Sequence, residues 1–156
     1  MNDSIIAWST FALAGFTLIL IIVGYYQLYH LVKTQNLATL SEYLKRYNTI
    51  VAKIPLKYFV PEFSPVSLDD KSKNELLQIM FEYWNLVAEE FMFKRRGWID
   101  LKIWNGWERG LEYHLEKNAF FIWSWREISK THRYNRILRE FMDRQIKRIE
   151  NNTEKK

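Results

Sequence analysis

The N-terminal part of the chain contains one long apolar stretch. Residues 4–29 carry no formally charged side chain, and residues 5–23 read IIAWSTFALAGFTLILIIV. At about 1.5 Å per residue, this stretch is long enough to cross a hydrocarbon core of about 30 Å. Because lipid offers no hydrogen-bond partner to an open backbone, a segment that crosses it must be helical. The sequence therefore predicts one transmembrane helix within residues 1–32.

The charges on either side of the apolar stretch favour one orientation. Residues 33–57 carry five basic residues and one acid, whereas residues 1–32 carry only Asp3. Positive charge stays on the cytoplasmic side, so we expect a single-pass protein of the cell inner membrane with its N-terminus outside and its C-terminal domain cytoplasmic. A cleaved signal peptide is disfavoured, since it would need a basic start and a shorter apolar core.

The pattern after the anchor changes to a helical period. Apolar residues recur at spacings of three and four over residues 36–54, which indicates one helical face. Pro55 ends this helix, and all three prolines lie in the connector PLKYFVPEFSPVS. We therefore divide the chain into a transmembrane anchor (1–32), a juxtamembrane helix (33–54) and a cytoplasmic basic helical ligand-binding domain (55–156).

Four further helices are predicted in the domain, each with apolar residues along one face. The first begins near Ser67, which two aspartates follow, and Gly97 is a suitable C-cap at its end. The others cover residues 101–117, 119–130 and 134–150. No segment alternates as a strand would. The predicted fold class is all-α, with one N-terminal transmembrane helix followed by a small cytoplasmic helical bundle.

Charge narrows the classes of partner. All 23 Lys and Arg residues lie after position 32 together with 17 of the 18 acids, so this part of the chain has a net charge of +6. Such a surplus suits an anionic partner, whether nucleic acid, nucleotide or lipid headgroup. Roughly 120 residues lie outside the anchor, which is enough for one domain.

Most enzymatic signals are missing from the sequence. The chain has no cysteine, hence no thiol nucleophile and no thiolate metal site. Its five glycines are not clustered, and His30, His114 and His132 are far apart in sequence. The adjacent acids Glu89 and Glu90 are interpreted as solvated faces of a helix. We predict no catalytic residue, cofactor or metal site.

One catalytic alternative stays open. The spacings from Arg109 to His114 and from Arg126 to His132 resemble the Arg-to-His signature of HEPN-type ribonucleases. In that family the two side chains act on the RNA 2′-hydroxyl and the scissile phosphate across a dimer, and histidine is a natural acid and base near neutral pH. The family favours Asn, Asp or His after the Arg, whereas this chain has Gly and Glu. A membrane-tethered HEPN-like ribonuclease is therefore the alternative function.

The basic segment REISKTHRYNR, residues 126–136, joins the last two predicted helices. It precedes a helix N-terminus, whose free amides favour phosphate, and Trp125 beside it is a candidate to stack on a base. A solvated turn or a patch that contacts anionic lipid are the other interpretations. The predicted ligand-binding residues are Trp125, Arg126, Lys130, Thr131, His132, Arg133, Asn135 and Arg136. Lys94, Arg95 and Arg96 form a secondary basic cluster, or else a charge cap at a helix C-terminus.

Three segments carry a resemblance to a known family: MNDSIIAWSTFALAGFTLIL, FEYWNLVAEEFMFKRRGWIDLKIW and WSWREISKTHRYNRILREF. In their order along the chain and their general residue composition they resemble membrane-bound ancillary effectors of type III CRISPR antiphage defence. Those proteins bind a cyclic oligoadenylate in a cytosolic domain and act at the membrane. The resemblance implies a homo-oligomer, a tetramer, around cyclic tetra-adenylate, with disruption of the lipid bilayer as the antiviral output. An adaptor with a lipid-facing basic surface is a further alternative.

Overall fold

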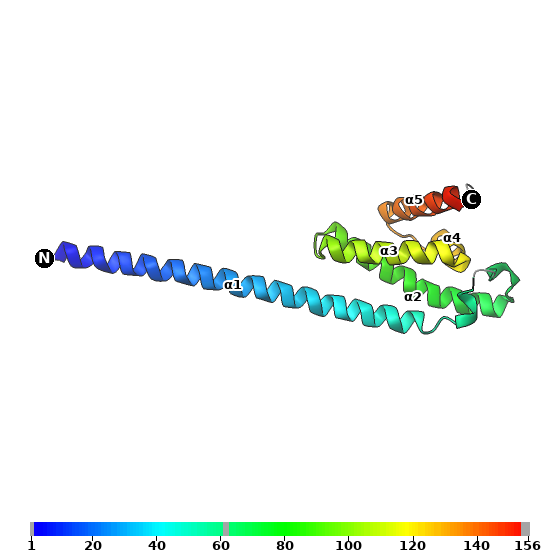
Figure 1. Ribbon diagram of the computed structural model, residues 1–156, viewed down its shortest axis with the longest axis horizontal. Coiled ribbons are helices and arrows are strands. Elements are labelled where there is room, and N and C mark those ends of the chain that lie inside the picture. The colour runs from blue at the N-terminus through cyan, green and yellow to red at the C-terminus, as the bar shows by residue number, and fades with distance from the viewer. Residues whose placement is uncertain (1, 61–62, 154–156) are drawn as a thin grey trace. The chain divides into compact units, whose positions relative to one another are not determined.

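The computed structural model describes the backbone of residues 2–60 and 63–153 and the side chains of residues 8–60 and 63–152 (Figure 1). No strand occurs in these ranges, so the predicted all-α class is confirmed. The elements are α1 (Asn2–Val51), η1 (Leu56–Tyr58), η2 (Pro65–Ser67), α2 (Asp70–Arg95), α3 (Leu101–Lys117), α4 (Ala119–Thr131) and α5 (Arg136–Thr153).

α1 is one uninterrupted helix of 50 residues (Figure 1). It is long and apolar enough to cross a membrane, and every side chain from residue 8 to residue 38 is exposed. Exposed apolar side chains over a helical stretch of this length, such as Phe11 and Leu20, are stable in lipid and unfavourable in water. The predicted apolar helix is confirmed, and the predicted juxtamembrane helix is its direct continuation.

The chain divides into two compact units, Met1–Glu42 and Tyr43–Lys156. The second unit contains the last turns of α1, which the predicted boundary at residue 55 assigned to the juxtamembrane helix. Tyr43 and Ile50 in these turns are buried, because they pack into the core of the second unit. Arg46 on this part of α1 forms an ion pair with Glu89 of α2, and Lys53, in the turn after α1, forms one with Glu82.

The ends of the helices in this second unit, hereafter the helical domain, follow local capping rules. Asp69 caps α2, since its carboxylate accepts a hydrogen bond from the Ser72 amide at 2.9 Å. The predicted cap Ser67 instead donates its hydroxyl to the Ser64 carbonyl oxygen at 2.7 Å. Gly97 follows the C-cap of α2 with a φ of 68°, the left-handed conformation that glycine adopts most easily.

The core of the helical domain is centred on α4, which packs against both α2 and α3. Trp84, Phe120 and Phe121 have no exposed surface. The Trp84 indole Nε1 donates to the Ser124 hydroxyl at 3.1 Å, and that hydroxyl donates to the Phe121 carbonyl oxygen at 3.0 Å. The polar side-chain atoms of Trp84 and Ser124 are thus hydrogen-bonded, as burial favours, whereas His114 Nδ1 and Gln145 Oε1 are buried without a partner among the described residues.

Candidate functional site

The predicted ligand-binding segment lies at the junction between α4 and α5. α4 ends at Thr131, His132 has an extended backbone, and α5 begins at Arg136. The Thr131 hydroxyl donates to a carbonyl oxygen of α4 at 3.1 Å, and Asn135 Oδ1 accepts from the Ile137 amide at 2.9 Å. The side chains of Thr131 and Asn135, both predicted to bind the ligand, therefore hydrogen-bond to the backbone at the helix ends. The Ile137 amide, at the helix N-terminus expected to bind phosphate, already has an acceptor.

The four cations of the junction are exposed, and three of them pair with carboxylates. The pairs are Arg126 with Glu150 at 2.6 Å, Lys130 with Glu127 at 2.7 Å and Arg136 with Glu140 at 3.6 Å. Arg133 pairs with no acid in the part of the chain that the structure describes. Exposed ion pairs contribute about 0–1 kcal/mol, so an anionic ligand can displace their carboxylates.

A groove of about 650 Å³ lies beside the junction, between α4 and α5. Its charged lining is balanced, with three basic and three acidic side chains. These are Arg126, Lys130, Lys147, Glu127, Asp143 and Glu150. The groove itself therefore has no surplus of positive charge, and the basic character of the junction comes from the turn and the first residue of α5, where Arg133 and Arg136 are exposed.

Trp125 lies in the core and does not fit the predicted base-stacking role. It is 2% exposed, its ring centroid is 5.1 Å from that of Trp84, and it stacks on Tyr134 at 5.2 Å. His132 is the exposed ring at the junction, and it lies against Phe81 at 4.3 Å. The junction thus offers an imidazole beside its cations, where the sequence suggested an indole.

The secondary basic cluster lies at the C-terminus of α2. The Lys94 ammonium lies 4.9 Å from the ring centroid of Trp104, and the Arg96 guanidinium lies 4.7 Å from that of Trp98. Arg95 is exposed beside them. Cations at a helix C-terminus are stabilised by the helix dipole, and two of these three also have an aromatic partner. The charge-cap interpretation therefore accounts for the cluster without a ligand.

The Arg109–His114 pair does not form a shared site within one copy of the chain. Five residues in a helix correspond to a rotation of about 140°, which separates the two side chains around α3. Arg109 donates its Nε to the Asn105 carbonyl oxygen on the exposed side, while the His114 ring stacks on Phe121 at 4.6 Å. His114 Nε2 lies 2.7 Å from the Tyr47 hydroxyl, and burial lowers the pKa of this imidazole.

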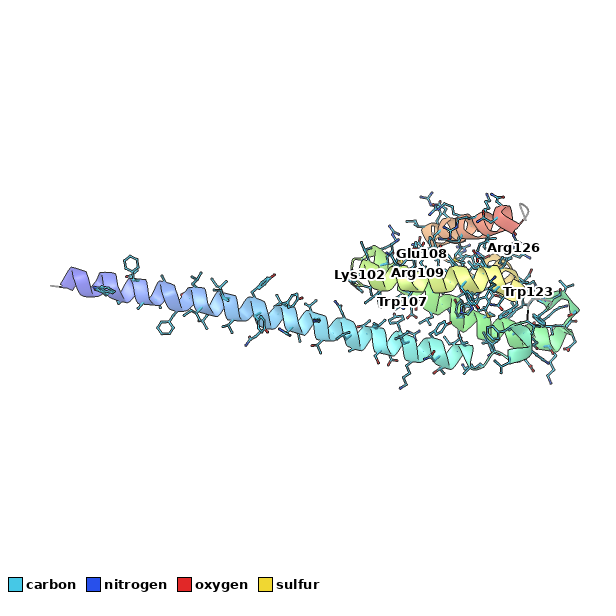
Figure 2. The ribbon with its side chains drawn as sticks, viewed as in Figure 1. Lys102, Trp107, Glu108, Arg109, Trp123 and Arg126 are labelled. Atoms are coloured by element: carbon cyan, nitrogen blue, oxygen red, sulfur yellow. The ribbon has the colours of Figure 1, made fainter. Side chains whose placement is uncertain are left out.

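A second candidate site, which the sequence did not suggest, is a cavity of about 120 Å³ between the last turns of α1, α2 and α3. Trp107 and Glu108 of α3 both line it, and Figure 2 shows these two side chains on different sides of that helix. The cavity is lined mainly by aromatic and aliphatic side chains, with two glycines at α3. Its lining is Tyr43, Leu44, Tyr47, Tyr83, Leu86, Val87, Glu90, Trp104, Gly106, Trp107, Glu108, Gly110 and Leu111.

The two adjacent acids of α2 have different environments. Glu89 accepts two hydrogen bonds from Arg46, at 2.7 and 3.2 Å, and one from the Tyr43 hydroxyl at 3.1 Å. Glu90 has no hydrogen-bond partner among the described residues, and burial raises its pKa to about 8. Glu90 is half-buried whereas Glu89 is exposed, so the prediction that both acids lie on solvated faces is wrong for Glu90.

The position of Glu90 in the helical period of α2 could have indicated that it lies on the inner face. This residue lies three positions after Val87 and seven after Tyr83, both of which are buried. Residues at those spacings share one face of an α-helix, so Glu90 belongs to the inner face of α2.

Comparison with known proteins adds no relative to these observations. No family model, curated protein or solved structure matches the chain. Its function is therefore inferred from its own residues and their geometry, together with the resemblance in layout described above.

Proposed function

We propose that the chain is a single-pass membrane effector whose helical domain binds a cyclic oligoadenylate, with cyclic tetra-adenylate preferred. The N-terminal part of α1 is the proposed membrane segment, because it is apolar and the side chains from residue 8 to residue 38 are exposed. The observation that carries the ligand proposal is the group of exposed cations Lys130, Arg133 and Arg136, which lies at one helix junction beside exposed His132.

The chemistry of the junction suits a phosphodiester ligand. A guanidinium donates two parallel hydrogen bonds to a phosphate, and such charge-assisted bonds are stronger than neutral ones. The carboxylates that now pair with Lys130 and Arg136 are half-buried and exposed respectively, so the exchange for phosphate removes little stabilisation. The choice of a cyclic oligoadenylate over other phosphodiesters is supported by the sequence resemblance.

A ring of identical nucleotides also suggests the assembly. Each subunit of a symmetric homo-oligomer presents the same junction, so a tetramer would offer one basic junction to each phosphate of a four-membered ring. We propose that binding then shifts the packing of neighbouring α1 helices, in an inner membrane with the helical domain on the cytoplasmic side, and so disrupts the bilayer. Gly15 and Gly24 in α1 support this step, because small residues allow close helix contact in lipid.

The test is a binding titration of the full chain in lipid nanodiscs with cyclic tetra-adenylate. We expect saturable binding at micromolar ligand, and substitution of both Arg133 and Arg136 by Ala should weaken it by about 1.5–3 kcal/mol per lost charged bond, at least tenfold. The matched control replaces Arg95 and Arg96 by Ala, which removes two cations at the other cluster. Lack of binding, or equal affinity for linear tetra-adenylate and ATP, would contradict the proposal.

The same preparation separates the two alternatives. Cleavage of labelled RNA that is abolished by His114→Ala or His132→Ala would favour the ribonuclease. Binding to anionic vesicles that falls steeply with salt and ignores nucleotide would favour the lipid-facing adaptor. Under either alternative the wild type would show no specific nucleotide binding, so the substitution of Arg133 and Arg136 would have no nucleotide affinity to weaken.

A further inference from the structure

The cavity between α1, α2 and α3 has an unusual balance of charge in its lining. Its charged lining residues are Glu90 and Glu108, and no Lys or Arg is among them. Aromatic rings make up much of the remaining wall, and the ring centroids of Tyr43 and Trp107 are 5.7 Å apart. The face of an aromatic ring is electrically negative. Both kinds of lining group therefore favour a positively charged occupant.

Of the two carboxylates, Glu90 is the one whose charge is not satisfied within the domain. Glu108 accepts hydrogen bonds from Trp104 Nε1 at 2.7 Å and from Gln145 Nε2 at 3.0 Å. Glu90 accepts none from any described residue. Glu90 is half-buried, and a carboxylate without a partner in such a position is costly when ionised. The cavity thus contains one acid that lacks a counter-charge.

The charges around Glu90 do not supply that counter-charge. Burial raises the pKa of Glu90, the Arg46 guanidinium lowers it and the Glu89 carboxylate raises it. Arg46 is already bound to Glu89 by two hydrogen bonds. The pKa values of Tyr47 and Tyr83 are raised by burial and in part by the charge of Glu90, so the carboxylate lies near these two rings.

We propose that this cavity binds a small organic cation of the quaternary ammonium type, with the rings of Tyr47, Tyr83 and Trp107 around its methyl groups and Glu90 as its counter-ion. Aromatic rings bind such cations through their faces, and a nearby carboxylate adds a direct charge interaction. Two aromatic rings of the lining already carry a cation: the Lys94 ammonium is 4.9 Å from the Trp104 centroid, and the Arg46 guanidinium is 5.3 Å from that of Tyr43.

The size of the cavity limits the ligand to a head group. A volume of about 120 Å³ is of the order of a cavity that holds one benzene-sized molecule. That matches one nitrogen with three or four methyl groups. Gly106 and Gly110 of its lining are exposed, and a Cβ atom at either position would meet nothing within 4 Å. A longer substituent on the nitrogen can leave the cavity there.

The test uses the full chain in nanodiscs of phosphatidylglycerol, a lipid without an ammonium group, and two probes of the same shape. Choline carries the quaternary nitrogen, and 3,3-dimethylbutan-1-ol replaces that nitrogen by carbon. Calorimetric titration should show choline binding at least about tenfold more tightly than the neutral alcohol. Choline affinity should also rise between about pH 6 and about pH 9, because the bound cation requires ionised Glu90.

Three variants test whether choline binds in this cavity. Glu90→Gln keeps the shape and removes the charge, and should reduce choline affinity at least about tenfold. Trp107→Leu, which removes one ring, should weaken choline and leave the weak binding of the alcohol within about twofold. Glu75→Gln, an exposed acid earlier in α2, is the matched control and should bind as the wild type does. Circular dichroism confirms that each variant is folded.

Three outcomes would overturn the proposal: no choline binding, equal affinity for choline and the alcohol, or unchanged choline affinity in Glu90→Gln. A further arm replaces half of the phosphatidylglycerol by phosphatidylcholine. A rise in the apparent dissociation constant of free choline would identify the lipid head group as a source of the cation, and no change would identify a soluble amine. This site is separate from the α4–α5 junction, so the loss of either proposal leaves the other standing.

Discussion

Replacement of Glu90 by Gln is expected to make the helical domain more stable at alkaline pH. Burial raises the pKa of Glu90 in the folded protein from its ordinary value of 4.5 to about 8. The folded state therefore holds this proton more tightly than the unfolded state does. The contribution of Glu90 to stability is highest below pH 4.5 and falls as pH rises from 4.5 to about 8, because ionisation of this side chain then favours the unfolded chain. Gln keeps the shape of the side chain and cannot ionise.

The size of the effect follows from the same linkage. One pKa unit is worth about 1.4 kcal/mol, so a rise from 4.5 to about 8 sets an upper limit of ~5 kcal/mol. Water that enters the cavity solvates the ionised carboxylate and reduces this amount. We therefore expect the variant to exceed the wild type by ~2–4 kcal/mol at about pH 9 and to match it at about pH 4.

The assay is urea denaturation of the full chain in non-ionic micelles, followed by tryptophan emission at several pH values. Wild type and variant are compared at each pH, so other titrating groups such as His114 contribute equally to both. Glu75→Gln is again the control, since an exposed acid should leave the pH dependence unchanged. If the Glu90→Gln and wild-type curves stay parallel from about pH 4 to about pH 9, Glu90 is solvated and the reasoning is refuted.

Three other expectations concern stability. Ser124→Ala should cost ~1–3 kcal/mol in urea denaturation, because it leaves the Trp84 indole N–H buried without an acceptor, and adding Trp84→Phe should cost less than the sum of the two changes. Gly97→Ala should cost ~1–2 kcal/mol by the same measurement, since its φ of 68° disfavours a Cβ atom; equal stability would show that the turn relaxes. Burial lowers the pKa of His114, so the wild type should lose stability as pH falls below 6.5, and His114→Phe should lose less over the same range.

The helices were predictable from the sequence because their signals are local. The apolar stripe of α2 and the glycine after it lie within one segment, and the predicted bounds of α3 coincide with the observed Leu101–Lys117. The start of α5 was placed two residues early, because Asn135 caps that helix with its side chain and so shifts the boundary to Arg136. The periodicity of apolar residues identifies the buried face of a helix, whereas the geometry of its cap determines the first helical residue.

The site residues were less predictable because they depend on contacts between distant segments. The aromatic cavity combines side chains from α1, α2 and α3, and no spacing within one helix reveals such a cavity. Trp125 and Arg126 are neighbours in sequence, yet one is buried and the other exposed, since successive residues of a helix point about 100° apart. Because Trp125 and Arg126 are adjacent in the sequence, they suggested one site for a base and a phosphate. In the helix their side chains point to different sides, so they do not form one site.

The packing of Trp84 on Trp125 also gives the molecule an optical property. The two indole centroids are 5.1 Å apart with their planes at 63°, and both rings are fixed in the core. Indole transitions at that separation couple, and a chiral pair of this kind produces a near-ultraviolet circular dichroism band only while the core is rigidly packed. The helical domain therefore carries its own spectroscopic probe of side-chain order, which needs no label and does not depend on the helix signal of α1.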